Sequence, residues 1–194
     1  ALGSDQVSAL GLTQLKSIST DVFAAITTTQ LALIEPMTWS GLTTSQISNL
    51  SSTQTQSLTE QQLSAMTNAQ VSSLTTNQVN WLTSSEYANL SGTQLKALTT
   101  AQIQAVETSD LITFNFDQIS TISTNSIRAL TTLQIQAVTT SQATFMQLPQ
   151  ITALSAEQLQ AVTSDDFNVW DVSQLQAIST VSLSSLSTSA IQAI

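Results

Sequence analysis

The sequence contains no cysteine and no histidine. Disulfide bonds, zinc sites built from Cys and His, and every catalytic triad that depends on histidine are therefore excluded. Glycine occurs only 4 times in 194 residues, which is too few for the corners of a β-solenoid, where Gly or Asn is needed. The absence of cysteine leaves the compartment open on redox grounds.

Basic residues are also scarce. Lys and Arg together number 3 against 12 Asp and Glu, so the net charge is −9. A chain with so few cations cannot neutralise a phosphate backbone, which argues against nucleic acid as a partner; anionic membrane surfaces are disfavoured for the same reason. No apolar run approaches the roughly 20 residues of a membrane span, so we expect no membrane insertion.

One eight-residue repeat fills the chain. Residues 3–194 divide into 24 consecutive octads without insertion or deletion, and their consensus T-T-x-Q-[LIV]-x-A-[LIV] is visible in TTLQIQAV at 131–138. Position 8 is apolar in all 24 octads, and position 5 in 23, with Thr55 as the exception. We find no linker and no second domain, so residues 1–194 are predicted to form a single continuous repeat array.

The octad encodes the start of a short helix. Ser or Thr at position 1 and Gln at position 4 form a capping box, while the apolar residues at positions 8 and 5 form a hydrophobic staple across each helix start. All 12 acidic residues fall at positions 1–4, and the three bases, Lys16, Lys96 and Arg128, fall at position 6. This polarity suits the helix dipole. Helices are therefore predicted to begin near position 1 or 2 of every octad.

Other readings of the period fail on geometry. In one continuous helix the apolar stripe would drift by about 80° per repeat, and in a strand positions 5 and 8 would point to opposite faces. Disorder does not fit 41% hydrophobic residues in perfect phase. The sequence predicts an all-α fold, an elongated α-solenoid of short helices with positions 5 and 8 buried.

A 16-residue period over the octad predicts two helices per coil. The position-5 aromatics all fall in odd-numbered octads: Phe23, Trp39, Tyr87 and Phe167. The bulkiest position-7 residues fall in even-numbered ones: Leu33, Trp81 and Phe145. Small Ala or Ser at the other position 7 sites would then allow the helices to approach closely.

No constellation of residues indicates catalysis. Acid pairs such as Asp165 with Asp166, or Glu107 with Asp110, could bind a cation or act as general acid and base, but the helix dipole explains all 12 acids at once. The serines have no His partner. We therefore predict no enzyme activity, no catalytic residue, no metal site and no cofactor.

Apolar residues at positions where the consensus is polar are the candidate contact residues. These are Leu12, Phe116, Leu148 and Val172 at position 2. They either fold over the core locally or make lateral contacts with another copy or another chain. A solenoid cut between repeats also exposes apolar surface at its ends, which here would include Val7, Leu10, Ile191 and Ile194. Because both ends of the chain are in phase with the repeat, we expect it to be a piece of something larger.

Units such as LTTAQIQAV (98–106) and LTTLQIQAV (130–138) resemble the tandem LTTxQ[IV]QAL repeats of large secreted bacterial surface proteins, often described as adhesin-like. The resemblance covers essentially the whole chain and transfers no site. It implies an extracellular or cell-surface location. We expect a structural role as a stalk, filament or surface-layer element, with a homo-oligomer or further repeats of the same chain as partner. The alternative is an adhesin-type binding module that recognises a glycan or a protein.

Overall fold

The computed structural model describes residues 3–184 and 186–193. Within these residues the chain forms 24 short α-helices, one in each octad, and no strand. Each helix begins at position 2 of its octad, so the predicted all-helical repeat and its helix starts are confirmed.

The helices divide into two compact units of 12 helices each. The first unit, Ala1–Ala97, contains α1 (Ser4–Ser8), α2 (Leu12–Ser17), α3 (Thr20–Ala24), α4 (Thr28–Leu31), α5 (Pro36–Trp39), α6 (Thr44–Ser48), α7 (Ser52–Thr55), α8 (Glu60–Ser64), α9 (Asn68–Ser73), α10 (Thr76–Asn80), α11 (Ser84–Asn89) and α12 (Gly92–Lys96).

The second unit, Leu98–Ile194, contains α13 (Thr100–Ala105), α14 (Thr108–Leu111), α15 (Phe116–Thr121), α16 (Thr124–Ala129), α17 (Thr132–Ala137), α18 (Thr140–Ala143), α19 (Leu148–Ala153), α20 (Ala156–Ala161), α21 (Ser164–Val169), α22 (Val172–Gln176), α23 (Thr180–Leu183) and α24 (Thr188–Ala193).

A capping box starts each typical helix, and the N-cap of the next octad ends that helix. At α9, the Thr67 hydroxyl accepts from the Gln70 backbone N–H at 3.3 Å, and the Gln70 Oε1 accepts from the Thr67 backbone N–H at 2.7 Å. At the other end, Leu74 has left the helical conformation, with φ −56° and ψ 139°. Because the next cap, Thr75, is also extended, the chain turns there and the helix cannot grow beyond about two turns.

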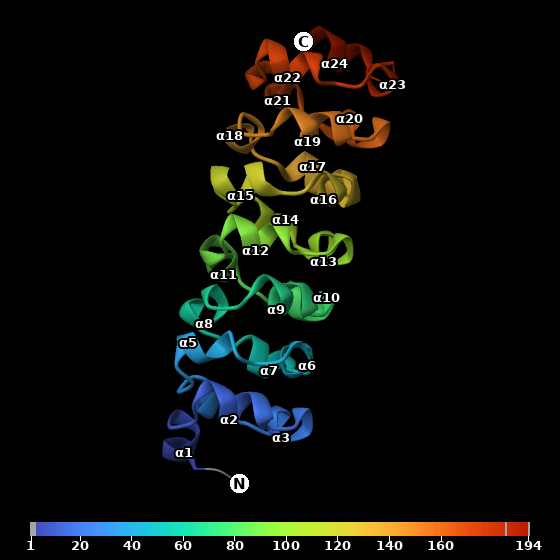
Figure 1. Ribbon diagram of the computed structural model, residues 1–194. Helices are drawn as coiled ribbons and strands as arrows, with labels where there is room; N and C mark the ends of the chain where they lie inside the picture. The colour runs from blue at the N-terminus through green and yellow to red at the C-terminus, as the bar shows by residue number, and fades with distance from the viewer. Residues whose placement is uncertain (1–2, 185, 194) are drawn as a thin grey trace. The chain divides into compact units, whose positions relative to one another are not determined.

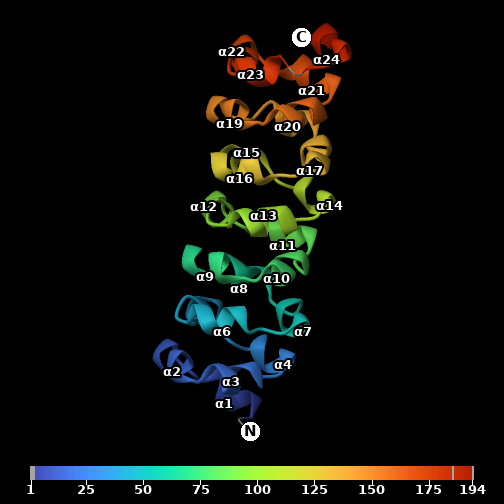
Figure 2. The same cartoon turned by 90° about the vertical axis from the view of Figure 1, so that its right-hand side faces the viewer.

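Within each unit, most helices pack on the helix three places along the chain, as α5 does on α8, α6 on α9, and α17 on α20. Figure 1 shows α5, α6 and α7 in one layer and α8, α9 and α10 in the next, and Figure 2 shows the same for α6 and α7 beside α8, α9 and α10. A coil therefore holds three octads, or 24 residues, and the predicted 16-residue coil of two helices is wrong.

The residues that suggested the 16-residue period do not lie where that prediction placed them. Position 7 is open to solvent at Leu33 and Phe145, which are 43% and 44% exposed, although Ala153 at the same position is buried. The bulky residues at position 7 therefore do not define a 16-residue coil.

Position 4 joins one coil to the next through a contact that we call the position-4 clamp. At Gln70 the side-chain nitrogen Nε2 donates to the backbone carbonyls of Trp39, at 2.6 Å, and Leu42, at 2.8 Å. These residues occupy positions 5 and 8 of the octad four places earlier. The amide thus caps its own helix with its oxygen and binds the preceding coil with its nitrogen. Within the units, the clamp to the position-8 carbonyl recurs at 2.7–3.0 Å for Gln46, Gln54, Gln62, Gln78, Gln94, Gln134, Gln142, Gln150, Gln158 and Gln174.

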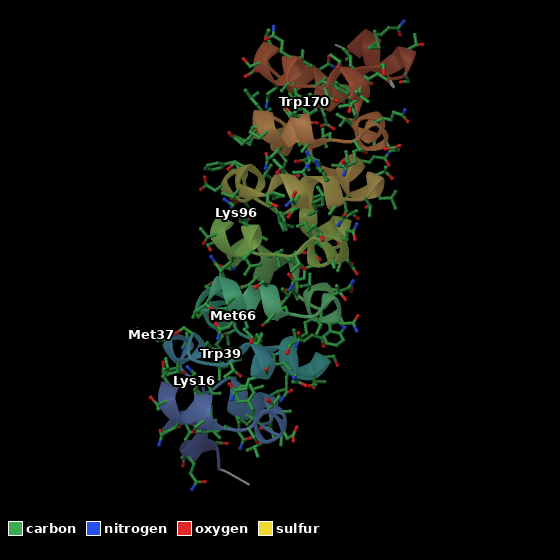
Figure 3. All side chains as sticks on the ribbon, turned by 45° about the vertical axis from the view of Figure 1, so that its right-hand side comes forward. Lys16, Met37, Trp39, Met66, Lys96 and Trp170 are labelled. Atoms are coloured by element: carbon green, nitrogen blue, oxygen red, sulfur yellow. The ribbon has the colours of Figure 1, made fainter. Side chains whose placement is uncertain are left out.

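The core consists of positions 5 and 8, as predicted. From Val7 to Phe167, every position 5 residue is buried, and most position 8 residues are buried with them. Figure 3 shows Trp39 within the first unit and Met37 at its outer edge. Near the C-terminus the pattern weakens, because the position 5 residues Leu183 and Ile191 are 41% and 50% exposed.

Candidate functional site

Acidic side chains are spread over many octads in the part of the chain that the structure describes. There, no group of three or more Asp, Glu, His or Cys residues is placed to hold a metal ion. Among the same residues, no helix has the length and apolar character needed to cross a bilayer. The exposed apolar side chains are the remaining candidates for a functional surface.

The proposed contact residues at position 2 all lie on the surface. Leu12 is 43%, Phe116 54%, Leu148 45% and Val172 69% exposed. Ile191 is 50% exposed, whereas Ile194 lies outside the described residues. Val7, which was expected to be exposed at the N-terminal end, is instead buried at 1%. Its helix, α1, packs on α4, as the three-octad coil requires.

Position 2 lies beside position 7 of the octad three places later. The Ser73 hydroxyl donates to the Thr44 carbonyl at 3.4 Å across this boundary. Leu12 covers Gly41 so closely that a Cβ added to Gly41 would overlap the Leu12 side chain. Leu12 thus packs locally on the next coil and still leaves 43% of its surface in solvent.

Phe116 and Phe145 form an aromatic pair at the same two octad positions, 2 and 7. They have the same 29-residue separation as Leu12 and Gly41, and their ring centroids lie 5.3 Å apart with a tilt of 38°. Both rings are about half exposed. Such a pair is worth about 1 kcal/mol beyond its buried area, yet it leaves two aromatic faces accessible on one side of the second unit.

A surface hollow of about 270 Å³ lies beside these two rings. We call it the aromatic hollow. Its lining residues come from three octads of the second unit: Ile112, Phe114, Asn115, Phe116, Thr139, Ser141, Gln142 and Phe145. None of them carries a charge, although the chain as a whole has a net charge of −9. The hollow is therefore suited to a neutral group with an apolar face, held by contact with the rings and by the polar atoms around them.

The sequence identified only one of the three exposed apolar residues of this hollow. Phe116 was singled out because it interrupts the polar position 2. Phe145 was interpreted as one of the bulky position 7 residues of the 16-residue period. Nothing in the octad pattern marks Ile112, which lies at position 6 and is 48% exposed. The signal that could have found Phe145 is its separation of 29 residues from Phe116, but that separation has meaning only when a coil is known to hold three octads.

The candidate residues do not form one patch. Phe116 lies with Phe145 and Ile112 in the aromatic hollow. Leu12 belongs to the first unit and packs on Gly41. Leu148 lies on α19, beside the segment where the Thr152 hydroxyl donates to the Ala177 carbonyl at 3.0 Å.

The acidic residues lie mainly at helix N-termini, as predicted from the helix dipole. The backbone N–H of Glu157 and the Ser155 hydroxyl, which donates to Glu157 Oε2 at 2.9 Å, lower the pKa of the exposed Glu157 carboxyl. Glu86 and Asp166 take the place of Gln in the capping box, where their carboxylates accept from the backbone N–H groups of Thr83 and Thr163.

In a comparison with known proteins, no family model matches the chain and no curated protein is similar to it.

Proposed function

We propose that the chain is a structural repeat protein of the cell surface or extracellular space, which supplies length to a stalk, filament or surface layer and associates with further copies or further repeats. The observation that carries the proposal is the position-4 clamp. It joins an octad to the octad four places earlier through one glutamine and two backbone carbonyls. A fold held in this way extends by adding octads, because each new coil needs only its nearest neighbour.

Exposed apolar residues support self-association. Ile191 and Leu183 occupy position 5, which is buried from Val7 to Phe167. Apolar surface of this kind gains about 25 cal/mol per Å² when a neighbour covers it. The contact is head to tail if it uses Ile191 and Ile194, and lateral if it uses Leu12, Phe116, Leu148 or Val172. A head-to-tail contact between identical chains propagates as a fibre.

Electron microscopy of the purified chain tests the proposal. We expect filaments or sheets. The double variant Ile191→Lys/Ile194→Lys should shorten them if the ends form the contact, and Phe116→Ser/Phe145→Ser should separate them laterally if the aromatic hollow does. Met37→Ser is the matched control, because Met37 is 86% exposed and belongs to neither surface. Particles of single-chain size at every concentration would contradict self-association.

The second candidate is a binding module, and the aromatic hollow is the observation that favours it. Two half-exposed rings above a neutral surface hollow can stack on the apolar face of a sugar or receive an apolar side chain of a protein. Binding to glycans or proteins that is lost in Phe116→Ser/Phe145→Ser, by a wild-type chain that stays monomeric, would favour this function over the structural one.

A further inference from the structure

The aromatic hollow contains polar side chains whose hydrogen-bonding capacity is not used up within the protein. Asn115 Oδ1 accepts from the Gln118 backbone N–H at 3.0 Å, which leaves the Asn115 side-chain nitrogen as a donor. The Thr139 hydroxyl accepts from the Gln142 backbone N–H at 3.3 Å and keeps its own proton to donate. In the part of the chain that the structure describes, the hydroxyl of the exposed Ser141 bonds to no protein group. Three polar side chains are thus available to a ligand.

The apolar part of the hollow lies on the same side of the second unit. Phe116 on α15 and Phe145, which follows α18, come from neighbouring layers (Figure 1). Their rings are tilted by 38° and remain 54% and 44% exposed, and Ile112 beside them is 48% exposed. Apolar surface that is gathered in one place and rimmed by polar groups is typical of a binding site.

The size of the hollow limits what can enter it. Its volume of about 270 Å³ is near the lower end of the range for small-molecule sites, which is about 300–1,000 Å³. One turn of an α-helix, about 10 Å across and 5.4 Å long, fills about 400 Å³. The hollow therefore admits a group of the size of one ring, and it does not admit a helix of a partner protein.

The charge and polarity of the lining narrow the chemistry further. No lining residue is charged, so an anionic ligand would find no cation in the hollow and would be repelled by a chain with a net charge of −9. An apolar side chain of a protein would cover the rings, but it would leave Asn115, Thr139 and Ser141 without partners, which costs free energy. A neutral ring with hydroxyl groups around its edge satisfies both parts of the lining.

We propose that the aromatic hollow binds one ring of a neutral glycan built from pyranoses with equatorial hydroxyl groups. Such a ring has only C–H groups on its two faces. One face packs on the rings of Phe116 and Phe145, while the hydroxyl groups at the edge pair with Asn115, Thr139 and Ser141. An axial hydroxyl would instead be pressed against an aromatic ring without a partner. The proposal rests on the binding module given above as the second candidate function, and it does not require self-association.

The test is calorimetric titration of the full chain with cellohexaose, a linear β-1,4-linked glucose hexamer, for which we expect saturable binding. Phe116→Ser/Phe145→Ser should raise the dissociation constant at least about tenfold. Ser141→Ala should raise it about fivefold, and this variant keeps the test decisive if the double variant fails to fold by circular dichroism. Leu133→Ser is the matched control, because Leu133 is 68% exposed in the same unit and lies outside the hollow.

Two related hexamers test the chemistry of the ligand. β-1,4-Mannohexaose differs from cellohexaose by an axial hydroxyl at C2 and should bind about fivefold more weakly. The hexamer oxidised to carboxylates at C6 keeps the equatorial hydroxyls but is anionic, and it should bind at least about tenfold more weakly. In saturation-transfer NMR, the C–H protons of cellohexaose should receive magnetisation from the wild type and lose it in Phe116→Ser/Phe145→Ser.

Four results would overturn the proposal. They are the absence of saturable binding at millimolar cellohexaose, binding that is unchanged in Phe116→Ser/Phe145→Ser, equal affinity for mannohexaose, and equal affinity for the oxidised hexamer. The structural function can fail separately, because a chain that binds cellohexaose and forms no filament contradicts only self-association. If cellohexaose does not bind and wild-type filaments separate laterally in Phe116→Ser/Phe145→Ser, the hollow holds a second copy of the chain and the glycan proposal is wrong.

Discussion

Two neighbouring stretches of the second unit use the same backbone with different side chains at position 4. In the first, Gln134, Gln142, Gln150 and Gln158 form consecutive clamps. In the second, Asp166 presents an oxygen in place of the amide nitrogen, and at position 182 a serine hydroxyl donates to the Leu154 carbonyl at 3.1 Å. The helices start at the same octad position in both stretches. The capping box thus uses the acceptor atom of the position-4 side chain, whereas the position-4 clamp uses its donor.

The largest effect is expected from removing an intact clamp. Gln158 is 3% exposed; it accepts from the Ser155 N–H at 3.0 Å and donates to the Ile127 and Leu130 carbonyls at 2.7 Å each. Gln158→Ala leaves these groups unpaired and opens a cavity, so we expect a loss of about 3–5 kcal/mol in the free energy of unfolding. Chemical denaturation measures it.

The control for this variant is Gln176→Ala, because Gln176 lies at position 6 and is exposed. It should change stability by less than about 0.5 kcal/mol. If Gln158→Ala and Gln176→Ala have equal effects, the clamp does not stabilise the coil.

Glu86 allows a clamp to be added instead of removed, because its carboxylate lacks the hydrogen-bond donor that a glutamine side chain has at position 4. Its Oε2 accepts from the Thr83 N–H at 2.6 Å and from the Thr83 hydroxyl at 2.8 Å. The spacing of the clamp places the Thr55 and Leu58 carbonyls opposite its other oxygen. Glu86→Gln should add two hydrogen bonds and stabilise the protein by about 2 kcal/mol, as measured by denaturation. Glu60→Gln on the exposed surface should not reproduce this gain.

Thr55 is the polar exception at position 5 and is expected to give a smaller gain. Its side chain is fully buried, and its hydroxyl has no hydrogen-bond partner. Thr55→Val keeps the shape and removes the unpaired hydroxyl, so we expect a gain of about 1 kcal/mol in the free energy of unfolding. Thr53→Val, at an exposed position, is the control. A loss of stability in Thr55→Val would show that the hydroxyl has a partner in solution.

The smallest expected effect is on the pH dependence of the free energy of unfolding. The pKa of Glu157 is lowered by its backbone hydrogen bond and by the Ser155 hydroxyl. A carboxyl with a lowered pKa stabilises the folded state above its unfolded pKa, and this contribution is lost as pH falls through the folded value. Glu157→Gln should therefore reduce the slope of stability against pH in the acidic range. NMR titration of Glu157 in the wild type and in Ser155→Ala measures the cause, and an unchanged pKa in Ser155→Ala would refute it.

The helices could be predicted from the sequence because their signals are local. Thr67 and Gln70 lie three residues apart, and their two hydrogen bonds mark the start of α9 from within one octad. The burial of positions 5 and 8 followed from the same period. The exposed position of Phe116 also followed, because Phe is out of place at position 2. Its pairing with Phe145 did not follow, since that contact joins two coils.

The sequence by itself therefore determined where each helix begins and which positions it buries, because these depend on neighbours within one octad. Only the tertiary structure decided that a coil holds three octads, since the angle between successive helices is set by packing against residues about 24–31 positions away. It also decided the second role of the position-4 glutamine. The partners of its Nε2 are backbone carbonyls, which every residue possesses, so no pattern of side chains could reveal them.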